Sequence, residues 1–298
     1  MKKDDLLSIL ANSRFAEKNE KNFGKSKFLG TYFDSVASQI SSNFHGYLGI
    51  IKSLDEQFSL GLSGQELMLD AGSGTGHLSV VLKKSGINVV GIELDLNDLS
   101  VSRSISGVVL PGLDPYSYLL QGDLSSLNNI ASEHFSMINS SQVLEHVDPS
   151  LMFYVMSEFF RVLKPGGVLR LDLPDYRFPY EHHYRIPWIP FLNDDLSRAW
   201  LDGFDRPYEG LKYFSYTTLP QILGILQSFP FKILSAGTTV SDEERNNQLR
   251  CLSHYMDLNT RSHVELRCAA RQICNEDLQF VPSSMIIVAM KEEKTEFF

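Results

Sequence analysis

The sequence has few cysteines, no long apolar run and no excess of basic residues. Its three cysteines, Cys251, Cys268 and Cys274, lack the C-x-x-C spacing of a zinc site and do not suggest a disulfide framework, which favours a reducing compartment. No apolar stretch approaches the roughly 20 residues that span a bilayer, and the N-terminus lacks a signal-peptide pattern. With 27 basic and 36 acidic residues, the net charge of −9 argues against general nucleic-acid binding. We therefore expect a cytoplasmic, soluble protein.

The sequence also lacks the G-x-G-x-x-G spacing of dinucleotide-binding loops. Counting from Gly72, the sixth position is His77, and counting from Gly74 it is Ser79. What is present is an apolar run of strand length that ends in Asp70, then three alternate glycines, then a helical apolar stripe. Such a loop lies at the carboxyl end of a strand, where α/β sheets bind ligands. A carboxylate there repels a pyrophosphate, so the loop predicts a nucleoside-bearing cofactor without one.

The spacing Asp70-x-Gly72-x-Gly74-x-Gly76 resembles the first motif of the class I methyltransferases that use S-adenosylmethionine (SAM). SAM carries an ammonium and a sulfonium but no phosphate, which agrees with the acidic strand end. The resemblance implies that these four residues bind SAM. The alternative is a plain turn, because turns are also rich in glycine.

Further polar strand ends follow in the order that this family shows. Glu93 ends a second apolar strand about 20 residues past the loop, where an acid can accept both ribose hydroxyls. After a third strand, the resemblance implies that Asp123 receives the adenine amino group and that Leu124 meets the ring. A fourth strand runs into Ser141 and Gln142, which we also assign to cofactor binding.

A leucine-glutamate-histidine-valine run follows directly, and it too resembles this family. Its histidine, His146, is a candidate general base, although Glu145 and His146 can equally cap the next helix. Ser136 departs from the family, which commonly has an acid there. Lys164-Pro165-Gly166-Gly167 predicts a turn before a fifth strand. Because too few oxygen ligands are evident, we predict no metal ion.

The resemblance covers about residues 66 to 173 and implies an α/β fold with a seven-stranded, mostly parallel, doubly wound sheet. We expect an N-terminal helical segment at 1–62, in which Tyr32 is a candidate cofactor contact, and a methyltransferase domain at 63–298. Two insertions are expected, at 174–216 and 241–282. In the second we expect a solvated loop from Asp242 to Asn247 and a helix from His263 to Ile273.

The insertion at 174–216 holds twelve aromatic residues and five prolines. The prolines favour an ordered loop over helices. Because it follows the fifth strand, it should cover the substrate pocket, with most aromatic side chains packing a satellite core and a few lining the pocket. His182 and His183 are further candidates to deprotonate a hydroxyl, since histidine titrates near neutrality.

These patterns predict SAM-dependent methyl transfer to a small-molecule or saccharide acceptor, at oxygen, by direct in-line displacement. One alternative is an NAD-dependent oxidoreductase, against which the missing dinucleotide spacing argues. Another is a noncatalytic SAM-binding scaffold that uses the aromatic insertion as a protein interface. The sequence indicates neither the identity of the acceptor nor the oligomeric state.

Overall fold

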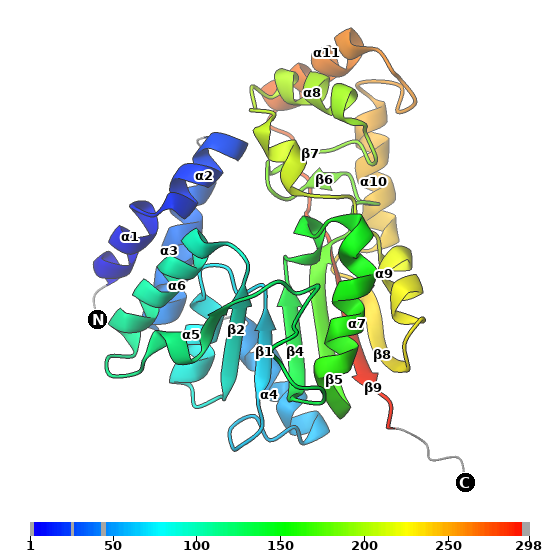
Figure 1. Cartoon of the computed structure of the whole chain (residues 1–298). Coiled ribbons are helices and arrows are strands. Elements are labelled where there is room, and N and C mark those ends of the chain that lie inside the picture. The colour runs from blue at the N-terminus through cyan, green and yellow to red at the C-terminus, as the bar shows by residue number, and fades with distance from the viewer. Residues whose placement is uncertain (1–2, 25–26, 43–45, 294–298) are drawn as a thin grey trace.

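A seven-stranded sheet runs through the centre of the computed structural model, which describes residues 3–24, 27–42 and 46–293 (Figure 1). The expected segments 1–62 and 63–298 therefore lie partly outside the described residues. The strand order is β3-β2-β1-β4-β5-β9-β8. The strands are β1 (Met68–Ala71), β2 (Val89–Glu93), β3 (Leu119–Gln121), β4 (Phe135–Ser141), β5 (Leu163–Pro174), β8 (Phe231–Thr238) and β9 (Ser284–Lys291).

The sheet is parallel from β3 to β5, and only β9 runs against its neighbours β5 and β8. All four residues of β1 are buried, as expected for a central parallel strand covered on both faces. Met68 pairs with Val89 on one side and with Met137 on the other. The expected seven-stranded, mostly parallel sheet is confirmed.

Helices cover both faces of the sheet. They are α1 (Lys3–Ala11), α2 (Arg14–Phe23), α3 (Lys27–Ser41), α4 (Gly46–Phe58), α5 (His77–Lys84), α6 (Leu96–Val109), α7 (Met152–Val162), α8 (Asp194–Gly203), α9 (Leu219–Leu226), α10 (Asp242–Ser253) and α11 (His263–Asn275). Apolar residues of α1 and α3 to α6 pack with Met68 on one face, whereas those of α7 and α9 pack with Leu69 on the other. Because successive strand residues point to opposite faces, both cores form around the same strands.

The two insertions pack on each other and form one cap over the carboxyl ends of the parallel strands (Figure 1). We call residues 174–216 and 241–282 together the cap. Its first part contains the hairpin β6 (Tyr180–Glu181) and β7 (Ile186–Pro187), and α8 packs against α11. Trp188 and Trp200 are fully buried in the shared core. The satellite core expected for most of the aromatic side chains is therefore present.

The ordered loop that the prolines favour at 174–216 is only part of this segment, because α8 within it is a helix of ten residues. The prolines at 190 and 207 lie outside it and so do not interrupt it. The Asn193 side chain caps its first turn by accepting from the backbone N–H of Leu196 at 3.0 Å.

The expected solvated loop from Asp242 to Asn247 is wrong, since these residues begin α10. The Ser241 hydroxyl accepts from the backbone N–H of Glu244 at 3.2 Å. Serine followed three residues later by glutamate is a helix-start pattern, and acidic residues in a first turn favour the helix dipole. The helix expected from His263 to Ile273 is confirmed as α11.

The turn expected at Lys164 to Gly167 is a bulge within β5 rather than a break before it. Strand β5 begins at Leu163, opposite Phe135, and its pairing with β4 shifts before Met137. Gly166 has a φ of +75°, which a glycine adopts without steric cost. A single strand therefore carries the chain from α7 to the cap.

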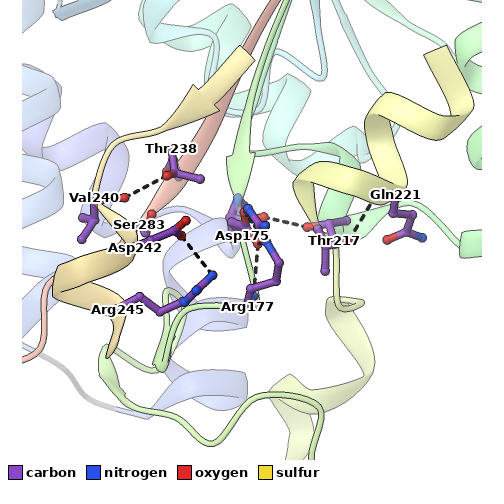
Figure 2. Close-up of polar contacts among 12 residues, drawn as sticks. Asp175, Arg177, Thr217, Gln221, Thr238, Val240, Asp242, Arg245 and Ser283 are labelled. Atoms are coloured by element: carbon purple, nitrogen blue, oxygen red, sulfur yellow. Dashed lines mark hydrogen bonds and ion pairs between the residues drawn. The ribbon is translucent and has the colours of Figure 1, made fainter. Parts of the chain in front are cut away.

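Polar contacts fasten the cap where it joins the sheet (Figure 2). The Thr217 hydroxyl donates to the Pro174 carbonyl at 2.8 Å, and the Asp175 N–H donates to the Ser283 carbonyl at 3.2 Å. Arg177 forms an ion pair with the buried Asp175. These contacts join both ends of the first insertion to the start of β9, so the cap is held at a defined position above the strands.

Short 3₁₀ turns occupy four connections: η1 (Pro115–Ser117), η2 (Leu144–His146), η3 (Pro149–Leu151) and η4 (Glu209–Tyr213). Asp148 and Pro149 begin the turn that leads into α7, with the Asp148 carboxylate accepting from the N–H of Ser150. None of the helices in the described part of the chain has the length and hydrophobicity needed to cross a bilayer.

Candidate active site

A cavity of about 810 Å³ lies between the carboxyl ends of the strands, α2 and the cap. Its size is within the range of sites for small molecules and cofactors. Gly72 and Gly74 of the loop after β1 form part of its wall, and Phe15 and Phe23 of α2 form another part. The N-terminal helices thus contribute directly to the cavity.

The loop after β1, residues 72–76, exposes its backbone to this cavity. Gly72, Gly74 and Gly76 all have positive φ, between +54° and +73°. A Cβ added at Gly74 would meet no atom within 4 Å, so the main chain there faces open space. The Gly74 N–H donates to Oε2 of Glu93 at 2.8 Å, and the Asp95 N–H donates to Oε1 at 2.9 Å. Glu93 therefore joins the ends of β1 and β2 at the cavity wall.

Six of the nine residues assigned to cofactor binding line the cavity: Gly72, Gly74, Glu93, Asp123, Leu124 and Gln142. Asp70, Gly76 and Ser141 are not part of its wall. Ser141 instead donates to the Tyr47 hydroxyl at 3.0 Å, and a Cβ on Gly76 would lie 2.1 Å from Oγ of Ser102. Their positions suit a supporting role behind the wall.

Asp70 lies behind the glycine loop and is only 4% exposed. Its carboxylate accepts a hydrogen bond of 2.6 Å from the Ser79 hydroxyl at the start of α5. Burial raises the pKa of Asp70 to about 6, an effect that the Ser79 hydrogen bond reduces. The carboxylate thus connects β1 to α5 from inside the protein.

The cavity wall next to Glu93 is acidic, and this part of the site was not predicted. Asp95 and Asp98, at the start of α6, both line the cavity. Burial raises the pKa of Asp98 to about 7. Lys18 of α2 forms an ion pair with Asp95 at 2.8 Å, across 77 positions of sequence. The only sequence signal for this wall was the acidic run after Glu93, which also reads as an ordinary helix start. Tyr32, the candidate contact from the N-terminal segment, lines the same cavity.

The opposite end of the cavity carries the three predicted histidines, His146, His182 and His183. Nε2 of His183 lies 3.4 Å from Nε2 of His146. Nδ1 of His183 donates to the Glu181 carboxylate at 2.7 Å, and Nδ1 of His146 donates to the Tyr213 carbonyl at 2.5 Å. We call His146 and His183 the imidazole pair. Since each Nδ1 has an acceptor, the two Nε2 atoms are the ones that face each other.

Aromatic rings fix the His183 ring from both sides. It stacks on Phe23 of α2 with a centroid distance of 5.4 Å and on Phe214 of the cap at 5.1 Å. Apart from Tyr213, none of the twelve aromatic residues of the first insertion lines the cavity. Their role is to hold the imidazole pair and the cap core rather than to form the cavity surface.

Two buried glutamates, Glu145 and Glu181, set the electrostatics of the imidazole pair. Burial of His183 disfavours its charged form, but the Glu181 carboxylate outweighs this and raises the pKa of His183. His146 lines the cavity, and burial of its ring together with the neighbouring His183 lowers the pKa of His146 to about 4. Burial raises the pKa of Glu145 to about 7. The two histidines therefore differ in basicity although they are in contact.

His182 is held apart from this pair. Its Nε2 donates to the Ser283 carbonyl at 3.1 Å, and burial lowers the pKa of His182. It lines the cavity, but its Nε2 is bonded to a backbone carbonyl and not to the imidazole pair. Of the three histidines, His146 and His183 are the ones that the fold brings together.

The methyltransferase domain family matches residues 69–171, from β1 to most of β5. An uncharacterized protein of Mycobacterium tuberculosis is 27% identical over 169 residues, which are 52% of this chain and 53% of that protein. A ubiquinone biosynthesis O-methyltransferase of Actinobacillus pleuropneumoniae is 31% identical over 114 residues, which are 38% of this chain and 47% of that enzyme. The chain thus spans about half the length of the curated relatives it matches.

The solved structures to which this chain is similar include a SAM-dependent methyltransferase from Archaeoglobus fulgidus. It is 15% identical, and the alignment covers 82% of this chain and 94% of that one with a TM-score of 0.45. A putative sarcosine dimethylglycine methyltransferase from Galdieria sulphuraria is 13% identical, with 81% and 86% covered and a TM-score of 0.47.

Proposed function

Because residues 69–171 belong to the class I, SAM-dependent methyltransferase family, we propose that this protein transfers a methyl group from SAM to a hydroxyl of a small molecule. The observation that carries the proposal is one cavity with two chemically different ends. The glycine loop and the acids form one end, and the imidazole pair forms the other. A saccharide is within this class of acceptor.

The residues at the end of the cavity formed by the glycine loop and the acids suit SAM. Gly74 leaves its main chain open to the cavity, so a bulky group can approach the backbone. Glu93, Asp95 and Asp98 give this wall a negative character that favours a cationic ligand and disfavours a pyrophosphate. In the proposal, Glu93 binds the ribose hydroxyls, Asp123 and Leu124 bind the adenine, and Gly72, Gly74 and Gln142 complete the wall. Bound SAM supplies a methyl group on a positively charged sulfur, already activated for transfer.

The imidazole pair receives the acceptor hydroxyl in this proposal. His146 and His183 both line the cavity, and neither ring can turn without losing its Nδ1 hydrogen bond. A hydroxyl that attacks a methyl group must lose its proton, and positioned imidazoles commonly assist such a step. His182 is a weaker candidate for this role, because its Nε2 already donates to the Ser283 carbonyl.

Calorimetry tests the cofactor assignment. We expect wild-type protein to bind SAM and the demethylated product S-adenosylhomocysteine, and not NADH. Glu93→Gln should weaken both SAM and S-adenosylhomocysteine by about 30-fold, or about 2 kcal/mol, because charge-assisted hydrogen bonds are lost. The exposed Glu243→Gln, on α10, is the control and should bind like wild type. NADH binding without SAM binding would replace the proposal by an oxidoreductase, and unchanged affinity in Glu93→Gln would remove the ribose role.

A further inference from the structure

Glu145 presents an unusual electrostatic problem. Its side chain is fully buried, and neither carboxylate oxygen has a hydrogen-bond partner among the described residues. A buried carboxylate without partners costs several kcal/mol, whether it stays charged or is protonated with an unpaired O–H. Native proteins rarely leave such a group unsatisfied, so Glu145 requires a partner other than the residues that the structure describes.

The imidazole pair lies next to this carboxylate. Nε2 of His146 is 4.0 Å from Oε1 of Glu145. One ligand atom each of Glu145, His146 and His183 lies within 4.8 Å of the other two. Two nitrogens and one oxygen, all with available lone pairs, therefore converge on one point at the cavity wall.

The distances match the geometry of a bound zinc ion. Two nitrogens bound to one tetrahedral zinc at about 2.0–2.1 Å lie about 3.3–3.4 Å apart. The two Nε2 atoms are 3.4 Å apart without any ion. Oε1 of Glu145 would have to approach His146 by about 0.6 Å to reach the same spacing. Since neither oxygen has a hydrogen-bond partner among the described residues, this shift breaks no hydrogen bond there.

We propose that Glu145, His146 and His183 form a binding site for a divalent transition-metal ion, with zinc as the best match. This departs from the expectation of no metal, which rested on too few oxygen ligands. Two histidines and one carboxylate are a common ligand set for catalytic zinc, and three protein ligands leave a fourth position open. That position faces the cavity, because His146 and His183 both line it.

The contacts around the ligands are those that metal-binding histidines need. The Glu181 carboxylate accepts from Nδ1 of His183, and the Tyr213 carbonyl accepts from Nδ1 of His146. Such partners fix the ring orientation and leave Nε2 free to coordinate an ion. Glu181 is itself fully buried and also accepts from the backbone N–H of Tyr184, which holds the carboxylate in place.

A metal ion at this site would activate the acceptor of the proposed methyl transfer, and this role of the ion rests on the proposed function. An acceptor hydroxyl in the open position would coordinate the ion, which lowers the pKa of a bound hydroxyl. Its proton would leave to solvent, and the imidazole pair would act on the hydroxyl through the ion. Ion binding itself can be measured without SAM and without knowledge of the acceptor.

Zinc binding to the metal-free protein is the test, measured by competition with a chromophoric chelator after dialysis against EDTA. We expect one zinc per chain. Glu145→Gln, His146→Ala and His183→Ala should each weaken binding by at least 100-fold, and Glu181→Gln by about 10- to 100-fold. His182→Ala is the matched control, since it removes a neighbouring cavity histidine outside the site. Circular dichroism and thermal melting identify variants that fail to fold, and cobalt substitution of wild type gives a second readout through its visible spectrum.

The outcomes separate the two proposals. Absence of stoichiometric zinc binding, or full binding in His146→Ala and His183→Ala, would overturn the metal site. Methyl transfer at the full rate after EDTA treatment would exclude a role for the ion while leaving the proposed function intact. Stoichiometric zinc binding without SAM binding would support the site and contradict the proposed function.

Discussion

His183 lies where three parts of the molecule meet. Its ring is stacked between Phe23 of α2 and Phe214 of the cap, its Nδ1 donates to Glu181, and its Nε2 approaches His146. A side chain with this many constraints has lost most of its rotamer freedom before any ligand binds. Such pre-organisation is what a positioned catalytic group requires.

His183→Asn should slow methyl transfer on the order of 10²-fold while SAM affinity stays unchanged. The reason is that His183 lies at the acceptor end, away from the glycine loop that the proposal assigns to SAM. Turnover is measured with the acceptor in excess, and SAM affinity by calorimetry. The exposed His263→Asn, at the start of α11, is the control. Equal turnover in His183→Asn and wild type would show that His183 does not act on the acceptor.

Asp70 predicts a pH dependence of stability. Its pKa in the folded protein is about 6, against an ordinary value of 3.8, because the carboxylate is buried. A raised pKa means that the folded protein holds this proton more tightly than the unfolded chain does. The stability that this group contributes is therefore fully present below about pH 4 and is lost as the pH rises to about 6, by up to about 3 kcal/mol.

Asp70→Asn should remove this loss, because the amide oxygen still accepts from Ser79 and carries no charge. Without SAM, the stability of Asp70→Asn relative to wild type should rise between pH 4 and 6 by up to about 3 kcal/mol. Urea unfolding at a series of pH values measures this difference. The exposed Asp257→Asn serves as reference. A constant difference between Asp70→Asn and wild type across this range would show that Asp70 does not titrate there.

At the scale of an element, the glycine loop shows two different needs for glycine. Gly72 has a φ of +73°, and a Cβ there would lie 2.4 Å from Cγ1 of Val143. Gly74 has a φ of +54°, but a Cβ there would meet nothing within 4 Å. The first glycine is required by packing and backbone together, whereas the second is required by its backbone and by the open cavity in front of it.

Gly74→Ala should therefore cost about 1–2 kcal/mol of stability. Gly72→Ala should cost about 2–4 kcal/mol, because a Cβ at Gly72 adds a clash with Val143 to the backbone strain. Urea unfolding measures both. Gly74→Ala should still weaken SAM binding, since its methyl group occupies the cavity wall. Equal destabilisation of the two variants would indicate that the contact of Gly72 with Val143 does not matter.

The elements differ in how well the sequence predicted them. The central strands were predictable because their apolar runs end in Asp70, Glu93 and Gln121, and burial on both faces leaves few other arrangements. Helix α10 was not predicted, because its polar first turns were interpreted as a loop and the helix-start pattern of Ser241 and Glu244 was not recognised. Polarity predicts exposure, and an exposed helix and an exposed loop look alike unless the cap is recognised.

At the scale of the whole molecule, the site combines segments that are distant in sequence. The glycine loop, Glu93 at the end of β2 and the histidine after β4 follow local patterns and were predicted from the sequence. The contact of Lys18 with Asp95 and the stacking of Phe23 on His183 depend on how α2 folds over the sheet. No local pattern encodes such packing, and for the same reason the approach of His146 to His183 across 37 positions was not foreseen.

The cap and α2 both contribute residues to the wall of the cavity. The two insertions share one apolar core, and polar contacts at Pro174 and Thr217 fix them to the sheet. Phe23 joins α2 to the cap through Tyr184, with ring centroids 5.2 Å apart. We therefore keep a small molecule as the proposed acceptor, since a cavity of about 810 Å³ is of the size that binds small molecules.

The most direct test of this account is transfer of a radiolabelled methyl group from SAM to the separated small molecules and macromolecules of a cell extract. We predict label in a small-molecule fraction, in a product from which hot hydriodic acid releases the label as methyl iodide, as it does from a methyl ether. Glu93→Gln at limiting SAM and His183→Asn should both reduce it. Label confined to protein or nucleic acid, or SAM binding without any transfer, would contradict the account.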